Sequence, residues 1–313
     1  MAYRFFTPPP ARQATGPVAG IYRQLREDFI GPAPTFQALS VAPDLMAATW
    51  ALMREALLAG DADRVEREVV AASVSRANRC RFCVDAHVTM LHALGSHDLA
   101  EAIASGGAPS SPRLAELVAW AEASRNPRAT GWASVYPPEL TGTLFAFHFI
   151  NRIVSALLTP DLLPGGLQRF PAVRSAGGRL YARTARAFVE PGENSVADAY
   201  AALREAALRG GDLLSSVARE TVAATVRWED GRHPDRPADW AGDLVRDLPP
   251  ADRVGARIVL LAAFAPSAIS VGDVGLWRLA HPDDADLVRL VGYGAIAATE
   301  HVAAALKGEY RHA

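Results

Sequence analysis

The chain has 313 residues, of which 50% are hydrophobic and 21% charged, and its formal net charge is −2. This composition is typical of a folded globular protein, and a chain of this length favours two domains or two repeats over one core. The 32 basic and 34 acidic residues are spread along the chain and form no basic stripe, so no nucleic-acid partner is expected.

No segment of the sequence predicts insertion into a membrane. The start of the chain has three consecutive prolines at positions 8–10 and lacks the apolar core of a signal peptide, so residues 1–17 are expected to form an extended arm. The most apolar run, residues 258–265, is far shorter than the roughly 20 residues that span a bilayer. We therefore expect no membrane partner. The chain has only two cysteines, three residues apart, which cannot form a disulfide scaffold and fit a reducing cytoplasm as the location.

A helical period dominates the chain. Apolar residues recur at steps of four, three and four at Met46, Trp50, Met53 and Leu57, whereas strand-like alternation is rare. Turn signals rich in glycine and proline separate such segments, at 31–32, 60–61, 95–96, 106–107, 137–138, 164–166, 210–211 and 249–250. The sequence therefore predicts an all-α protein with about a dozen helices.

The chain also repeats itself. Residues 67–74 match residues 219–226 at six of eight positions, and residues 51–60 resemble residues 201–210. The two offsets, 152 and 150, differ by only two residues, which a turn of different length accounts for. These matches predict a tandem duplication. The predicted units are an extended arm, a first repeat and a second repeat, at residues 1–17, 18–163 and 164–313.

The two repeats differ at the residues that are chemically reactive. In the first repeat Glu68 is followed by Cys80, Cys83 and His87, and these two cysteines are the only ones in the chain. Only Glu68 has a counterpart in the second repeat, Glu220. The residues opposite the two cysteines and the histidine are Arg232, Asp235 and Asp239. The second repeat is therefore predicted to be degenerate, with one redox centre per chain.

The spacing of the reactive residues predicts a thiol site. Cys80, Cys83 and His87 are expected on one face of a helix that begins at Cys80, because residues three and four apart are neighbours on a helix. Backbone N–H groups at a helix N-terminus and an adjacent imidazole both stabilise a thiolate, and Glu68 on the preceding helix can orient that imidazole. The helix-end position favours Cys80 as the more acidic thiol, whereas the step to His87 favours Cys83, so the spacing leaves their roles open.

Two neighbouring thiols of this kind can reduce a peroxide. The thiolate attacks one oxygen of ROOH, releases ROH and becomes a sulfenic acid, which the second thiol converts to a disulfide. An external dithiol then restores both thiols. The sequence contains neither of the glycine-rich motifs that bind nucleotides or dinucleotides, so no cofactor is expected.

These residues resemble those of a known family. Glu68, eleven intervening residues and then Cys80-x-x-Cys83-x-x-x-His87 resemble the motif of the alkylhydroperoxidase (AhpD) and carboxymuconolactone decarboxylase family, and residues 147–154 resemble a helix of its two-repeat members. The resemblance implies two AhpD-like multi-helical domains, with Cys83 as peroxidatic cysteine, Cys80 as resolving cysteine and Glu68 and His87 as proton relay. It also implies a dithiol reductant of thioredoxin or lipoyl type and a homo-oligomer, either a trimer or a dimer.

Other functions remain as alternatives. The decarboxylase branch of the family lacks the cysteine pair, so its ring chemistry is less favoured, and Phe82 stands where the best-known peroxidases carry a histidine. A structural zinc site needs ligands beyond the cysteines, and only Glu68, His92 or His148 are candidates, so no metal is predicted. A scaffold with buried, inert cysteines is a further alternative. His92 and His97 lie at a predicted helix end and are expected to cap it.

Overall fold

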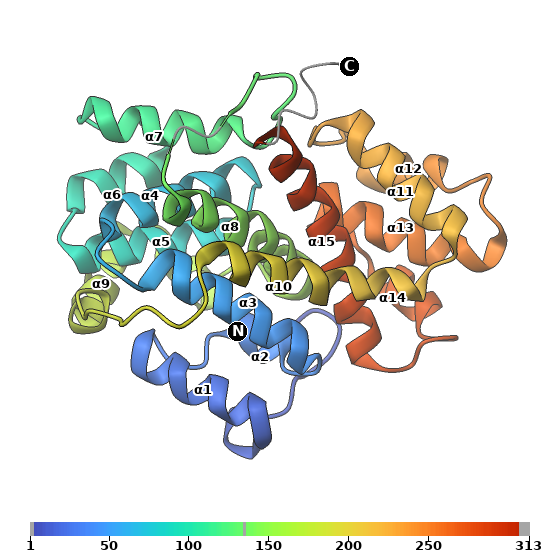
Figure 1. The fold of residues 1–313 in the computed structure, drawn as a ribbon, viewed down its shortest axis with the longest axis horizontal. Helices are drawn as coiled ribbons and strands as arrows, with labels where there is room; N and C mark the ends of the chain where they lie inside the picture. Colours follow the sequence, from blue (N-terminus) through green and yellow to red (C-terminus); the bar gives the residue numbers. More distant parts are fainter. Residues whose placement is uncertain (1–2, 134–135, 307–313) are drawn as a thin grey trace.

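The structure is a computed structural model that describes residues 3–133 and 136–306 (Figure 1). Over these two ranges the secondary structure is helical, with two isolated β-bridges and no β-strand. The predicted all-α class is therefore confirmed.

The described ranges contain fifteen α-helices and five shorter helical segments. The α-helices are α1 (Gly16–Asp28), α2 (Pro34–Leu39), α3 (Pro43–Met53), α4 (Arg64–Ala77), α5 (Arg81–Leu94), α6 (His97–Ser105), α7 (Pro112–Ala123), α8 (Pro138–Leu157), α9 (Pro171–Ala185), α10 (Val196–Leu208), α11 (Ser216–Glu229), α12 (Pro237–Leu244), α13 (Pro250–Phe264), α14 (Val271–Trp277) and α15 (Asp284–Leu306). The shorter segments are η1 (Ala11–Gln13), η2 (Arg54–Leu58), η3 (Pro164–Arg169), η4 (Arg209–Leu213) and η5 (Pro266–Ala268).

The helices end where the sequence predicted turns. Gly95 and Gly106 follow α5 and α6 in the left-handed conformation, with φ of 92° and 77°, which glycine adopts without the steric cost of a Cβ atom. Ser195 begins α10 with a capping box, in which its hydroxyl accepts from the backbone of Asp198 and the Asp198 carboxylate accepts in return. The local sequence therefore fixes these helix boundaries without help from tertiary contacts.

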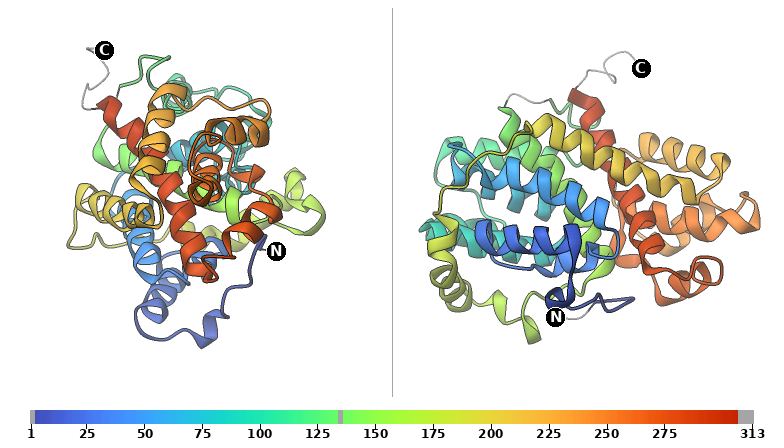
Figure 2. Two further views of the ribbon diagram at one scale, coloured as in Figure 1. Left: turned by 90° about the vertical axis from the view of Figure 1, so that its right-hand side faces the viewer. Right: turned by 60° about the horizontal axis from the view of Figure 1, so that its bottom comes forward.

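The same packing order occurs twice in the molecule. In the first half α4 packs against α7 and α8, and in the second half its counterpart α11 packs against α13 and α15. Helices α8 and α15 pack against each other, as do α3 and α10, so these four helices join the halves in the middle of the molecule (Figures 1 and 2). The order α3, α4, α7, α8 recurs as α10, α11, α13, α15, which agrees with the predicted tandem duplication.

The halves differ most in what covers α4 and its counterpart α11. Residues 67–75 of α4 are all buried, whereas much of α11 is exposed. The position of α5 along the chain is taken in the second half by a loop and the eight-residue helix α12. Glu220 is consequently exposed, although its counterpart Glu68 is completely buried. The second half therefore has the frame of the first without its site.

Helix α9 belongs by sequence to the second predicted repeat but packs on the first. It lies after residue 163, yet it packs along α5 of the first half. A pair of glycines permits this contact, because a Cβ atom on Gly178 would lie 2.6 Å from His92 Cβ and 2.9 Å from the backbone nitrogen of Ala93. The first and second halves therefore both contribute to the region around α5.

Two buried arginines bind the end of α13 to the first half. The guanidinium of Arg152 donates to Ala263 O at 2.8 Å, and that of Arg125 donates to Phe264 O at 3.1 Å and Gly231 O at 2.6 Å. The last carbonyls of a helix have no partner within it and carry partial negative charge, so they suit buried cations. Burial lowers the pKa of Arg125 to about 9. This network makes the junction between the halves specific.

In its described part the N-terminal segment has no regular secondary structure before α1 at Gly16 apart from a β-bridge at Tyr3 and the short η1, and α1 includes the last two residues of the predicted arm, 1–17. The Arg4 guanidinium holds the arm in place by donating to five backbone carbonyls: those of Ser155, Ala156, Pro266, Ser267 and Ile269. The arm thus contacts the end of α8 and the η5 segment together.

Helix α8 is the one described helix that is long and apolar enough to cross a membrane by length and composition. Within the protein 94% of its apolar window is buried, which is the pattern of a core helix. The sequence prediction overlooked this segment, because His148 and Arg152 interrupt its apolar run.

The close packing of α13 and α15 gives a prediction about two glycines. A Cβ atom on Gly294 would lie 2.5 Å from Val259 O, whereas one on Gly20 in α1 would have no atom within 4 Å. We expect Gly294→Ala to lower the free energy of unfolding by about 1–3 kcal/mol through overpacking. Gly20→Ala is the matched control and should raise it by about 0.5–1 kcal/mol. Urea unfolding of both variants measures this, and equal effects would contradict it.

Candidate active site

The junction between α4 and α5 places the first cysteine. Arg79 adopts a left-handed conformation with φ of 57°, and the Cys80 N–H donates to Ser75 O at 2.9 Å while the Arg79 N–H donates to Arg76 O at 2.9 Å. This is the hydrogen-bond pattern of a Schellman motif, with arginine at the position that is usually glycine. The motif ends α4 and sets Cys80 as the N-cap of α5.

The four predicted site residues are brought together by this junction. Cys80 and Cys83 form a disulfide with a Cα–Cα distance of 5.4 Å, so the described state of the site is the oxidised one. Cys83 lies in the first turn of α5, and His87 follows one turn later on the same helix. Both sulfur-bearing side chains are buried, with 2% and 3% of their surface exposed.

Glu68 is a buried carboxylate with three hydrogen bonds. Its Oε1 accepts from Arg64 Nε at 2.9 Å and Nη2 at 2.7 Å, and its Oε2 lies 2.6 Å from His87 Nδ1. Burial alone raises the pKa of Glu68, but the charges and hydrogen bonds of Arg64 and His87 outweigh it and lower the pKa. Glu68 is therefore ionised, and the Nδ1–H of His87 donates to it. The sequence prediction missed Arg64, although its four-residue step to Glu68 signals an ion pair on one helix.

The ring of His87 is also held by an aromatic contact. Phe147 of α8 packs edge-to-face against it, with ring centroids 4.3 Å apart and an interplanar angle of 88°. With Nδ1 donating to Glu68, the Nε2 atom of His87 is the nitrogen that can accept a proton. The helices α4, α5 and α8 thus fix both the tautomer and the plane of this imidazole.

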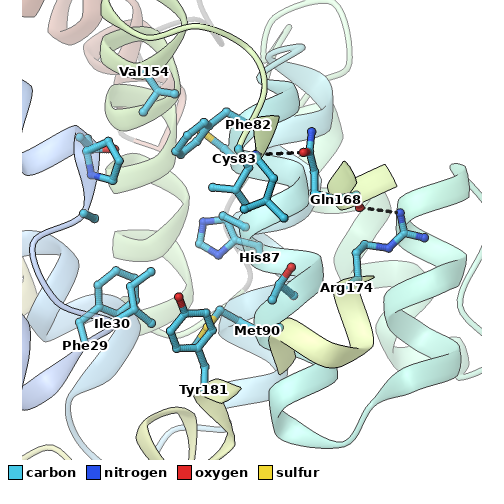
Figure 3. Close-up of a pocket in the computed structure, with 18 of the residues that line it drawn as sticks. Phe29, Ile30, Phe82, Cys83, His87, Met90, Val154, Gln168, Arg174 and Tyr181 are labelled. Carbon is cyan, nitrogen blue, oxygen red and sulfur yellow. Dashed lines mark hydrogen bonds between the residues drawn. The ribbon is translucent and has the colours of Figure 1, made fainter. Parts of the chain in front are cut away.

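An apolar cavity of about 560 Å³ opens beside the disulfide (Figure 3). From α5, one side of the helix lines it, with Phe82, Cys83, Ala86, His87, Thr89 and Met90, and this side includes Cys83 and His87 of the predicted face. Cys80 is not among the lining residues, so the predicted face is wrong in this one member. At the N-cap position its side chain lies outside the regular helical spacing. The two sulfurs therefore differ in that only Cys83 meets the cavity.

The far walls of the cavity come from distant parts of the sequence. The connection from α1 to α2 contributes Phe29 and Ile30, and η3 and α9 contribute Gln168, Arg174 and Tyr181 (Figure 3). Phe36 of α2 also lines the cavity. The sequence prediction found none of these residues. The available signal was the glycine pair at 177–178 within a helical segment, which indicates close approach to another helix.

His92 and His97 do not cap α5, which corrects the sequence prediction. His92 Nδ1 lies 2.8 Å from His97 Nδ1, and His92 Nε2 lies 2.8 Å from Glu101 Oε1. Glu101 also pairs with Arg174 of α9, through its Nε at 3.1 Å and through Nη2. These side chains bind partners on α6 and α9 instead of backbone carbonyls, because α9 brings Arg174 over this helix end. The cluster holds α9, which forms part of the cavity wall, against α6 and the end of α5.

The residues considered for a zinc site do not assemble one. His148 is fully buried, with Nε2 2.8 Å from Ser124 Oγ and Nδ1 3.3 Å from Asn78 Nδ2. Burial, with Arg152 and Arg125 nearby, lowers the pKa of His148 well below its usual value. Over residues 3–133 and 136–306, no three histidine, cysteine or acidic side chains gather as metal ligands. The structure thus gives the zinc alternative no support.

The comparison with known proteins agrees with this site. Residues 43–123 match the carboxymuconolactone decarboxylase family, and this stretch contains α4, α5 and all four predicted site residues. The chain is 33% identical over 316 residues, covering 93% of this chain and 91% of its relative, to a protein of Mycobacterium tuberculosis named alkyl hydroperoxide reductase. A search of solved structures gave no significant match.

The chain therefore belongs to the carboxymuconolactone decarboxylase family and has its AhpD-like, all-helical fold, as the motif predicted. The stretch that matches the family model carries the cysteine pair and the buried glutamate, and the alignment with the reductase covers 93% of the chain.

The lowered pKa of Glu68 predicts how stability depends on pH. A depressed pKa contributes stability above the pKa of an unfolded glutamate, about 4.3, and this contribution is lost as the pH falls through the folded value. We expect Glu68→Gln to be less stable than wild type by roughly 3–5 kcal/mol at pH 7, since Arg64 loses its buried partner. This difference should shrink at pH 3. Urea unfolding at both pH values measures it, with exposed Glu193→Gln as control; a difference independent of pH would contradict it.

Proposed function

We propose that this protein is a thiol-dependent peroxidase that reduces hydroperoxides through a disulfide cycle of Cys80 and Cys83. One observation carries the proposal: Cys83 and His87 line the same apolar cavity, and His87 is bonded to the buried carboxylate of Glu68. The similarity to an alkyl hydroperoxide reductase supports an oxidoreductase of this kind.

In the proposed first step, His87 activates the thiol of reduced Cys83. Its Nε2 accepts the thiol proton, and the imidazolium that forms is stabilised by Glu68 at 2.6 Å. The N-terminus of α5 stabilises the thiolate, because Cys83 lies in its first turn. The thiolate attacks one oxygen of ROOH, the O–O bond breaks, and the leaving alkoxide takes the proton from His87 as ROH. Cys83 is then a sulfenic acid, oxidised by two electrons.

In the second step, the thiol of Cys80 attacks the Cys83 sulfenic sulfur, water leaves and the disulfide forms. A dithiol reductant of thioredoxin or lipoyl type returns two electrons and two protons. This order follows from the cavity, which reaches Cys83 and not Cys80. Because Cys80 is only 2% exposed, attack on it by a protein dithiol requires local opening of the α4–α5 junction.

The cavity favours organic hydroperoxides over hydrogen peroxide. Its volume of about 560 Å³ is in the range of sites for whole organic ligands, far above the size of a two-oxygen molecule. Phe29, Phe36, Phe82, Met90 and Ile150 are among the residues that line it. Burial of an apolar R group there supplies binding energy that hydrogen peroxide lacks.

The other chemistry named for the family fits this cavity less well. A carboxylated lactone carries anionic groups and needs cationic partners. Among the described residues that line the cavity, Arg174 alone carries a permanent positive charge, and Glu101 already pairs with it. Decarboxylase-like ring chemistry would also persist without the thiols, which separates the two proposals by experiment.

A reversible thiol cycle suits the reducing cytoplasm, which we propose as the location. We also propose that the chain forms a homo-oligomer, trimer or dimer. Large apolar side chains in and beside α14 support self-association through the second half, since Val271, Leu276 and Leu279 are all more than half exposed.

The assigned roles of the cysteines predict different failures of two variants. Cys83→Ser should lose peroxide consumption with a dithiol reductant by roughly 100-fold or more, because it lacks the nucleophile. Cys80→Ser should still react once with peroxide and add one oxygen to Cys83, visible by mass spectrometry as a sulfenic acid. Wild-type turnover by Cys83→Ser would refute the peroxidase proposal, and oxygen added at Cys80 in that variant would reverse the roles.

The cavity predicts a size-dependent effect of filling it. Ala86→Leu narrows the cavity one turn from Cys83, so kcat/KM for cumene hydroperoxide should fall about tenfold or more, with little change for hydrogen peroxide. Ala172→Leu is a matched control, because Ala172 is exposed on α9 and does not line the cavity. Equal losses with both peroxides would mean that the cavity does not hold the R group.

A further inference from the structure

The segment that covers the cavity is strongly basic. Residues 162–189, which form η3, α9 and their flanks, contain no aspartate or glutamate. They contain five arginines: Arg169, Arg174, Arg179, Arg183 and Arg186. Arg174 is buried against Glu101, and the other four are exposed. In a chain with a net charge of −2, this is a local reversal of charge.

Three of these arginines are exposed without a counter-ion. Arg179, Arg183 and Arg186 form no ion pair within the described ranges of the chain. Several exposed arginines in other parts of the chain do have an acidic partner, as Arg204 has in Glu300 and Arg246 has in Asp243. The positive charge on α9 is therefore available to an anionic partner.

Large apolar side chains are exposed on the same segment. Leu167 and Phe170 are 49% and 60% exposed, and Leu180 on α9 is 75% exposed between Arg179 and Arg183 on the same side of the helix. The segment lies at the outer edge of the molecule (Figure 2). A helix with arginines beside exposed apolar residues is typical of peripheral contact with a membrane surface.

The exposed apolar residues continue into the cavity. Leu163 and Leu180 both line the cavity, and they are also 36% and 75% exposed, so the apolar lining of the cavity continues onto the exposed surface of this segment. An apolar chain can therefore pass from this surface to Cys83 along an apolar path. This continuity distinguishes the surface from a simple basic patch.

We propose that this surface docks on an anionic lipid bilayer and that the cavity takes up a hydroperoxidised acyl chain from it. The docking surface, as we define it, comprises Leu167, Phe170, Arg179, Leu180 and Arg183. The arginines bind lipid phosphates, and the apolar residues enter the headgroup region. The uptake of the chain rests on the proposed peroxidase function, whereas the docking does not.

Two other occupants of this surface are less favoured. A second copy in a twofold dimer would place the same patch against itself, with its unpaired arginines facing each other. An acidic protein would pair with the arginines, but it would give no role to the exposed apolar residues Leu163 and Leu180 that also line the cavity. The sequence predicted no membrane partner because no spanning segment was found, and peripheral docking needs none.

Co-sedimentation of the full chain with vesicles tests the docking. The probes are vesicles of phosphatidylcholine with and without roughly 30 mol % phosphatidylglycerol. On the anionic vesicles each arginine near the surface contributes measurably to binding. Wild type should bind the anionic vesicles, and binding should weaken as salt rises. Arg179→Gln with Arg183→Gln should weaken it about 30-fold, and Phe170→Ser should weaken it about tenfold.

The matched controls are Arg236→Gln and Trp228→Ser. Both residues are exposed in the second half, with 85% of the Arg236 side chain and 82% of Trp228 accessible, and both variants should bind as wild type does. Equal binding to neutral and anionic vesicles, or equal effects of control and test variants, would overturn the proposal. Sensitivity to the arginines alone would also overturn it, in favour of an acidic protein partner. A loss of self-association in the test variants would assign the surface to a second copy.

Activity separates this proposal from the peroxidase function. Phe170 does not line the cavity, so the Phe170→Ser variant should turn over soluble cumene hydroperoxide at the wild-type rate. Its turnover of a phospholipid hydroperoxide in anionic vesicles should fall about tenfold, in step with binding. If vesicles bind but no peroxide is consumed, the peroxidase proposal fails and the docking stands. Equal turnover of the vesicle substrate by both proteins would refute the uptake.

Discussion

The site depends on a carboxylate that is kept ionised where no water reaches it. Glu68 is completely buried, and an isolated charge there would be neutralised by protonation. Arg64 on one oxygen and His87 on the other prevent this, since each stabilises the anion. The hydrogen bond between Glu68 and His87 in turn fixes the proton on Nδ1 of the imidazole and leaves Nε2 free to act as a base. In the proposed first step, both the activation of the Cys83 thiol and the protonation of the leaving alkoxide use that nitrogen.

Much of this site could be predicted from the sequence because its parts are local. Cys83 and His87 are one turn apart on one helix, and Glu68 lies on the helix before, so the spacing alone placed them together. The position of Cys80 was less predictable, because it depends on a left-handed Arg79 in the turn between the helices. No periodic pattern reveals such a conformation at a residue other than glycine or asparagine.

The walls of the cavity could not be predicted, because they depend on contacts between distant segments. The repeat prediction placed the boundary between the two units at residue 163. Helical periodicity gave no reason to expect that α9, which belongs to the second predicted unit, packs on α5 of the first. Gly178 allows this packing, because the absence of a side chain there lets the backbone of α9 approach His92 and Ala93 of α5 closely. What holds it is the Glu101 pair with Arg174. The predicted boundary remains a hypothesis about the ancestry of the chain. The cavity is lined by residues from both sides of that boundary.

The second half contributes to the site without carrying reactive residues of its own. Because a loop and α12 stand at the position of α5, Glu220 is exposed and α11 lies largely at the surface. It keeps α13 and α15, and the free carbonyls at the end of α13 receive Arg125 and Arg152 from the first half. Arg152 lies on α8, the helix whose Phe147 packs on His87. A fixed α8 means a fixed imidazole plane, so the degenerate half stabilises the geometry that the reactive half uses.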